Sequence, residues 1–289
     1  MTAPRRARTH PLRGIVLLVA AVSTFSVMDT TAKWLSQFYP VPAVVWSRYA
    51  AQVLVMLVVL GPRYGLRLVA TQRPRLQIAR GCVLVGSTML FFTAISLMPI
   101  AEASAISFVS PFILIALSVA FLGERVRTST WAAVAVSFVG VLFIIRPGSA
   151  VFSLVALLPL LTAFFFAVYQ LLTRKLAGVD STVATLFISA LVGAVTMTLV
   201  VPFFWAPLLA WWHALLFLAM GALAAAGHFM LIRAFEIAPA STLAPFVYAQ
   251  LVAVLVLGYA VFGNFPDHWS LVGMAIIVLT GAFVATRKH

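Results

Sequence analysis

The sequence predicts an all-α integral membrane protein that crosses the bilayer with ten helices, and two observations support this prediction. First, the 289-residue chain is 64% hydrophobic and only 9% charged, with a mean hydropathy of +1.13, whereas roughly a quarter of the residues of soluble domains are charged. Second, apolar stretches of the roughly 20 residues that a helix needs to cross the hydrocarbon core recur along the chain. Backbone groups in lipid must bond internally, and these stretches lack the alternation of barrel strands, so helices are expected.

Short interruptions separate the apolar stretches. In chain order, the predicted spans are Gly14–Trp34, Pro42–Leu60, Leu76–Met98, Ile100–Leu122, Thr130–Ile145, Phe152–Thr173, Thr182–Phe204, Trp211–Ile232, Ala240–Phe262 and Trp269–Ala285.

The first span ends in SVMDTTAKW and therefore carries two charges, Asp29 and Lys33. A basic N-terminus before an apolar stretch is also typical of a cleavable signal peptide. This stretch is long for a signal peptide, however, and passes into Trp34 without a small-residue cleavage site, so we expect it to remain as a span. Because Asp29 precedes Lys33 by four residues, one interpretation of the two charges is a local ion pair, with Lys33 reaching outward to the membrane surface.

The net charge of +13 is distributed asymmetrically. If the N-terminus is cytoplasmic, only Lys33, Arg48 and Arg146 fall toward the outer face. The other basic residues fall on the inner side: Arg5, Arg6, Arg8, Arg13, Arg63, Arg67, Arg73, Arg75, Arg80, Arg125, Arg127, Arg174, Lys175, Arg233, Arg287 and Lys288. This positive-inside pattern predicts a multi-pass protein of the bacterial inner membrane with both termini cytoplasmic, and it argues against nucleic-acid binding. We interpret the basic segment 63–80 as a contact for anionic lipid headgroups.

The chain repeats itself at a shift of about 140 residues. AISLMPIA (94–101) aligns with AFEIAPAS (234–241), and AFLGE (120–124) aligns with AVFGN (260–264). At nearly the same shift, Asp29 and Lys33 fall opposite Gln170 and Arg174. We therefore predict a basic N-terminus (1–13) followed by two related five-helix halves, 14–146 and 152–286. Because each half has an odd number of spans, the repeat is inverted, which is the usual construction of secondary transporters.

These features carry a family resemblance. The layout of five plus five spans, the SLMPIAEAS that begins the fourth span, the FLGERV that ends it and the AFEIAPASTLAPFVY of the second half resemble the EamA-type branch of the drug/metabolite transporter superfamily. The resemblance covers nearly the whole chain. It implies transport of small metabolites such as amino acids, amino-acid derivatives including metallophores, nucleosides or cofactors.

Charged residues in the spans are the first candidates for a substrate site or a gate. Asp29, Lys33, Arg48 and Glu102 are all expected within roughly 10 Å of the outer boundary, at 1.5 Å per helical residue. Isolated charges at this depth are costly, so we expect them to face one another or a water-filled cavity. The hypothesis is an external gate or a vestibule for a zwitterionic or charged metabolite.

The second half offers polar groups with little fixed charge. The candidates are Tyr169, Gln170, His228, Tyr248 and Gln250. His228 titrates near neutral pH and is one candidate for a proton carrier, although a lone histidine near a helix end is more often packed or solvated. Asp29 and Glu102 compete with it for that role.

Three prolines inside spans are candidates for helix breaks or hinges: Pro111, Pro159 and Pro245. Each removes a backbone hydrogen bond and can kink its helix, and neighbouring helices can equally satisfy the freed carbonyl groups. Small residues in AEASAIS (101–107) and GALAAAG (221–227) permit close helix approach.

The chain offers no constellation typical of an enzyme. The only cysteine is Cys82, the histidines are scattered, and a phosphate-binding glycine loop is missing, so we expect no catalytic residues, no metal and no cofactor. The favoured function is secondary export of a small polar or zwitterionic metabolite. Uptake of a cofactor of the S-adenosylmethionine or riboflavin type is the alternative, and a channel or scaffold is a different class. The expected partners are the metabolite, membrane lipids and protons as a coupling ion, and the sequence leaves the oligomeric state open.

Overall fold

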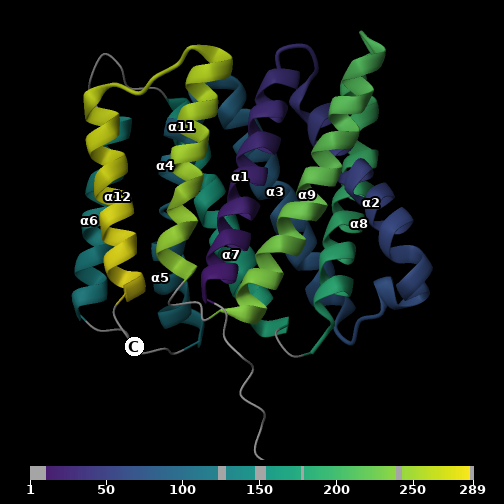
Figure 1. Ribbon diagram of the computed structural model, residues 1–289, viewed down its shortest axis with the longest axis horizontal. Helices are drawn as coiled ribbons and strands as arrows, with labels where there is room; N and C mark the ends of the chain where they lie inside the picture. The colour runs from purple at the N-terminus through teal and green to yellow at the C-terminus, as the bar shows by residue number, and fades with distance from the viewer. Residues whose placement is uncertain (1–10, 123–127, 147–153, 177–178, 239–242, 287–289) are drawn as a thin grey trace, which may run out of the picture.

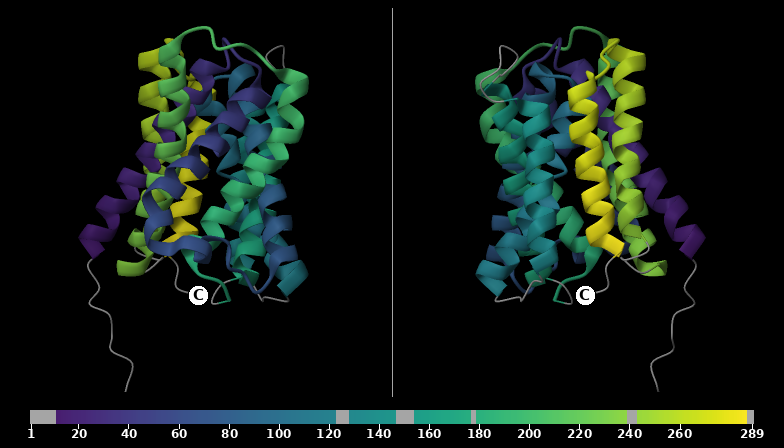
Figure 2. Two further views of the ribbon diagram at one scale, coloured as in Figure 1. Left: turned by 90° about the vertical axis from the view of Figure 1, so that its right-hand side faces the viewer. Right: turned by 90° about the vertical axis from the view of Figure 1, so that its left-hand side faces the viewer.

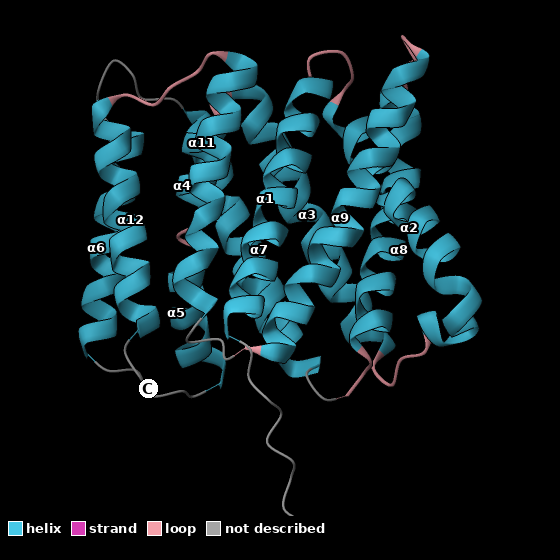
Figure 3. Ribbon diagram, in the orientation of Figure 1, coloured by secondary structure: helices cyan, strands magenta, loops and turns pink. Residues whose placement is uncertain are grey.

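The computed structural model describes residues 11–122, 128–146, 154–176, 179–238 and 243–286, and all regular structure in these ranges is helical (Figure 3). Seven apolar stretches of at least 18 residues and three shorter ones, Trp131–Ile145, Phe246–Phe262 and His268–Val284, coincide with the ten predicted spans. The first half contains α1 (Pro11–Leu35), α2 (Val41–Tyr64), η1 (Gly65–Val69), α3 (Pro74–Leu97), α4 (Ile100–Ser107), α5 (Ser110–Leu122) and α6 (Thr128–Ile145). The second half contains η2 (Leu154–Ala156), α7 (Leu157–Leu176), α8 (Thr182–Val200), η3 (Val201–Phe204), α9 (Trp211–Ile237), η4 (Ala244–Tyr248), α11 (Ala249–Phe262) and α12 (His268–Thr286). The all-α prediction is confirmed.

The spans stand side by side as an upright bundle (Figures 1 and 2). The first residue of α1 and the last residue of α12 lie at the same end, the lower one in Figure 1. By the positive-inside interpretation this lower end is the inner end of the bundle, and the upper end is the outer one. Large apolar side chains such as Leu199, Phe229 and Val252 are exposed on the bundle, as expected for helices that face lipid.

Each proline that was expected inside a span lies near the start of a helical segment. Pro111 is the second residue of α5, Pro159 the third residue of α7, and Pro245 the second residue of η4. Proline is tolerated in a first turn because the first backbone N–H groups of a helix have no intrahelical partner. The fourth span is accordingly broken at Phe108 and Val109, and the 3₁₀ turns η2 and η4 directly precede α7 and α11.

Contacts between helices occur in pairs that are related by exchanging the two halves. The contact of α1 with α9 corresponds to that of α7 with α3, and the contact of α2 with α9 corresponds to that of α8 with α3. The contact of α1 with α11 likewise corresponds to that of α7 with α5. Three further contacts join equivalent helices directly: α2 with α8, α4 with α11, and α6 with α12.

Small residues allow the closest of these approaches. A side chain at Gly221 of α9 would overlap the backbone of Ala51 in α2, and one at Gly193 of α8 would overlap the ring of Tyr49. In α6 and α12, Gly140 and Gly273 face each other, and an added Cβ at Gly140 would lie 2.9 Å from the Gly273 carbonyl oxygen. The close approach that the small-residue segments predict is therefore present at α2 and α9.

Candidate functional site

Ionisable side chains lie buried inside the bundle. Asp29, Lys33, Arg48 and Arg80 are all between 2% and 8% exposed. Burial of a charge is costly unless it is paired or hydrogen-bonded, so the partners of each of these side chains decide what it can do.

Asp29 in α1 and Arg48 in α2 are electrostatic neighbours that do not form an ion pair. The charge of Arg48 acts on the carboxyl group of Asp29, but no ion pair within 4.0 Å joins these two side chains. The guanidinium group of Arg48 donates from Nε to the Met28 sulfur at 3.4 Å and lies 4.6 Å from the centre of the Tyr49 ring. Its Nη1 is buried without a hydrogen-bond partner. The pair therefore places a buried carboxyl group near a guanidinium group that has an unpartnered nitrogen.

Lys33 is not paired with Asp29, and it does not reach outward to the membrane surface. Its ammonium group donates to the carbonyl oxygen of Ile95, and to that of Met98 at 2.8 Å, and it lies 5.2 Å from the centre of the Phe262 ring. These carbonyls belong to the C-terminal end of α3, where the last four carbonyls of a helix have no intrahelical partner and the helix dipole is negative. The expectation of a local ion pair is therefore wrong, because the helix end offers Lys33 a better site.

Glu102 lies apart from these charges. Its carboxylate accepts a hydrogen bond of 3.2 Å from the Ser270 hydroxyl in α12. The ion pair of Arg146 and Asp267, 2.6 Å between Nη2 and Oδ2, acts electrostatically on it. Asp29 and Arg48 are thus neighbours, whereas Lys33 and Glu102 each have separate partners.

Arg80 is the functional candidate that the sequence analysis missed. It was assigned to the basic segment that contacts lipid headgroups, but it is 2% exposed and lies inside the bundle. Its guanidinium group donates to the Thr173, Ser189 and Tyr169 hydroxyls at 2.7, 2.7 and 2.6 Å, to the Thr185 carbonyl at 3.1 Å and to Gln77 Oε1 at 3.4 Å. All of these partners are neutral, and four of them belong to α7 and α8. The position of Arg80 four residues into the predicted third span was the signal that could have identified it.

Arg80 also interacts with two candidates of the second half, Tyr169 and His228. The Tyr169 hydroxyl accepts from Arg80, and the guanidinium carbon lies 4.5 Å from the centre of the Tyr169 ring. The charges of Arg48 and Arg80 both act on His228, whose Nδ1 donates to the Ala224 carbonyl at 2.7 Å and whose ring meets Phe25 edge-on. Gln170, the residue after Tyr169 in α7, is half-buried.

Tyr248 and Gln250 lie at the junction of η4 and α11. The ring of Tyr248 is 5.4 Å from that of Phe108, so an aromatic contact joins this junction to the break between α4 and α5. The Tyr248 hydroxyl packs against Gly281 of α12. Gln250 contributes its backbone carbonyl, which accepts from the Ser26 hydroxyl at 3.5 Å.

A connection that we call the inner latch (Asp180, Thr71, Gln72 and Gln77) joins the loop between α7 and α8 to the segment that begins α3. The Asp180 carboxylate accepts from the Thr71 hydroxyl at 2.6 Å, from the Gln72 backbone N–H at 2.8 Å and from Gln77 Nε2 at 2.8 Å. Partial desolvation acts to raise the pKa of Asp180, but these three hydrogen bonds outweigh it and hold that pKa below its usual value. Gln77 also accepts from Arg80, so the latch continues into the buried guanidinium site.

A second connection, the outer latch (Tyr39, Leu209 and His213), lies at the other end of the bundle. The Tyr39 hydroxyl accepts from the Leu209 backbone N–H at 3.0 Å and is 2.7 Å from His213 Nδ1. Tyr39 and His213 are each 4% exposed. Three aromatic rings surround the histidine: Trp34, Phe38 and Trp212.

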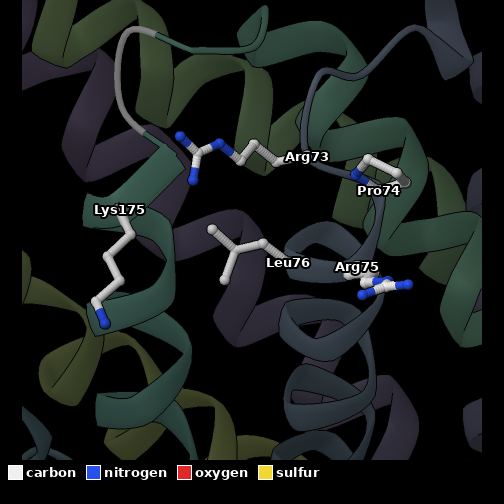
Figure 4. A pocket seen from close by; sticks show the side chains of 5 residues that line it. All are labelled: Arg73, Pro74, Arg75, Leu76 and Lys175. Carbon is white, nitrogen blue, oxygen red and sulfur yellow. The ribbon is translucent and has the colours of Figure 1, made fainter.

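The inner surface carries an open depression (Figure 4). Arg73, Pro74, Arg75 and Leu76 line it from the start of α3, and Lys175 lines it from the end of α7. In this view Lys175 and Arg75 lie on opposite sides of Leu76, and Arg73 lies above it. In the described ranges, no group of three or more His, Cys, Asp or Glu side chains is arranged to hold a metal ion.

Comparison with known proteins gives the family. A model of the EamA-like transporter family matches residues 12–146. The riboflavin transporter of Vibrio cholerae is 30% identical over 284 residues, which cover 95% of this chain and 93% of that protein. The pseudopaline exporter of Pseudomonas aeruginosa is 30% identical over 282 residues, which cover 95% of this chain and 96% of that protein.

The chain belongs to the EamA-like transporter family. It is therefore a multi-pass secondary transporter of a small molecule rather than an enzyme, and the resemblance to the drug/metabolite transporter superfamily is confirmed. The S-adenosylmethionine uptake transporter of Rickettsia conorii is 28% identical, with 96% of each chain covered. A crystal structure of a protein with 19% identity aligns with a TM-score of 0.61 over 94% of this chain and 95% of that chain, which shows a common fold.

Proposed function

We propose that this transporter exports a small zwitterionic metabolite, an amino acid or an amino-acid-derived compound such as a metallophore, across the bacterial inner membrane. Transport would proceed by alternating access, with both termini in the cytoplasm. The coupling ion would be the proton, and Asp29, Glu102 and His228 are the candidates to carry it.

The observation that carries this proposal is the state of Asp29 and Arg48. Both are buried, both belong to the first two spans, and neither satisfies the other in an ion pair. A buried guanidinium nitrogen without a partner is costly. A ligand with an ammonium and a carboxylate group would complete both side chains, because the carboxylate can accept from Arg48 while the ammonium group donates to Asp29.

Alternating access is supported by the paired helix contacts. Two inverted halves, 14–146 and 152–286, can exchange their conformations around a central site, which turns an inward-facing state into an outward-facing one. The contacts between helices are consistent with such halves, because exchanging the halves maps one set of contacts onto the other. The aromatic contact of Phe108 and Tyr248, which joins the fourth span to the ninth, also supports a meeting of the two halves.

Uptake is the second candidate, and one observation favours it. The relatives include uptake transporters for S-adenosylmethionine as well as an exporter of pseudopaline. A zwitterion site with both an acid and a base suits an amino-acid moiety in either direction, so direction requires a direct measurement.

A paired comparison of intracellular and extracellular metabolites tests the proposal. Cells that lack the protein are compared with cells that overproduce it. Export predicts a compound that is retained inside without the protein and enriched outside with it. The reverse pattern would replace export by uptake, and a compound without both an acidic and a basic group would contradict the zwitterion site.

A further inference from the structure

The two latches are related by the internal repeat. Tyr39 and Asp180 are 141 residues apart, and Gln72 and His213 are also 141 residues apart. The same separation relates Asp29 to Gln170 in the repeat. Exchanging the halves therefore maps the contact of Tyr39 with His213 onto the contact of Asp180 with Gln72.

This correspondence places equivalent contacts at opposite ends of the bundle. In each latch, the loop after the first span of one half bonds to the segment between the second and third spans of the other half. In each latch, too, a side chain from that loop accepts a backbone N–H, from Leu209 in one case and from Gln72 in the other. The side chains themselves differ, a tyrosine outside and an aspartate inside. The contact has therefore been kept while its chemistry has changed.

We propose that the outer and inner latches are the two gates of the transport cycle and that they open alternately. The proposal rests on the transport function above. Each latch ties the two halves together at one end, so the helices at that end can separate only after its hydrogen bonds break. Since the halves are inverted copies, opening one latch while the other stays closed gives the two access states. Both latches are closed in this structure.

The two gates are built to different strengths. The outer latch pairs a tyrosine with a histidine, and the rings of Trp34, Phe38 and Trp212 enclose that histidine. The inner latch holds a carboxylate with three hydrogen bonds and continues through Gln77 to Arg80. Loss of one latch should therefore favour opening at its own end, and loss of both should give an intermediate balance between the two ends.

Sidedness of thiol labelling tests this proposal without a substrate. Because Cys82 is the only cysteine, Cys82→Ser gives a background for single reporters. Ala32→Cys, at a buried position of α1 near the outer end, reports on outer opening, and Ala184→Cys, in the first turn of α8, reports on inner opening. A membrane-impermeant maleimide is applied to right-side-out and inside-out vesicles.

Tyr39→Phe should raise the ratio of outer to inner labelling rates, and Asp180→Ala should lower it. Tyr39→Phe removes two hydrogen bonds and Asp180→Ala removes three, and each lost bond corresponds to a shift of roughly 5-fold. Because the two shifts have opposite signs, the ratio of the double variant should lie between the ratios of the two single variants.

Tyr49→Phe is the matched control. It removes a buried tyrosine hydroxyl that bonds to Thr88 within the first half and crosses no latch, so the ratio should not change. The gate proposal would be overturned if both latch variants shifted the labelling ratio in the same direction. It would also be overturned if the ratio of the double variant did not lie between those of the single variants. Failure of the gates leaves metabolite transport by the wild type intact, so the two proposals can fail separately.

Discussion

Replacement of Arg80 by lysine keeps the charge but removes the guanidinium fork. Arg80 makes five hydrogen bonds, four of which tie α3 to α7 and α8. An ammonium group has three donors, so at least two bonds are lost. Each hydrogen bond from a charged group contributes about 1.5 kcal/mol to stability, so the free energy of unfolding should fall by about 3 kcal/mol. At about 2–4 °C per kcal/mol, the Tm should fall by about 6–12 °C.

Thermal unfolding of the purified protein in detergent or nanodiscs measures this change. Arg75→Lys is the matched control, because Arg75 is an exposed arginine five positions earlier in α3, and its Tm should stay that of the wild type. A Tm for Arg80→Lys within about 2 °C of the wild type corresponds to a stability change of less than about 1 kcal/mol. That result would refute the conclusion that the Arg80 hydrogen bonds stabilise the packing of α3 against α7 and α8.

Three further predictions follow from individual contacts. His228→Gln should leave the pH profile of transport unchanged if the Nδ1 bond to Ala224 is only structural, and a lost pH dependence would identify His228 as the proton carrier. Because hydrogen bonds hold the pKa of Asp180 below its usual value, the inner latch should contribute fully above about pH 4, the ordinary aspartate range, and weaken only as pH falls further. The difference in Tm between wild type and Asp180→Asn should accordingly be constant from about pH 5 to 8, and a change near neutral pH would contradict this sign. Lys33→Met should lower the Tm by removing the bonds to Ile95 and Met98, and an unchanged Tm would show that the end of α3 does not need this cap.

Hydropathy was sufficient to locate the spans, because length and apolar composition are local properties of the sequence. The breaks could be anticipated from Pro111 and Pro245, but their form could not. Both prolines are the second residue of a helical segment, where the first turn tolerates the missing N–H group.

The candidate site was harder to predict because it depends on contacts between distant segments. Lys33 has a sequence neighbour of opposite charge in Asp29, yet it bonds to carbonyls more than 60 residues away. Arg80 was grouped with the exposed arginines before it, although its place inside an apolar span already indicated burial. Tyr39 and Asp180 lie in loops and carry no sequence signal of their own. Their correspondence is revealed only when the alignment of the two repeats is combined with the hydrogen bonds.

The most direct test of the central claim is counterflow in proteoliposomes with the metabolite that the paired comparison identifies. We predict saturable counterflow by the wild type, and its loss in both Asp29→Asn and Arg48→Gln at unchanged membrane abundance, because each variant removes one of the two groups that receive a zwitterion. Normal counterflow by both variants would contradict the Asp29 and Arg48 site, and flux that neither saturates nor supports counterflow would indicate a channel.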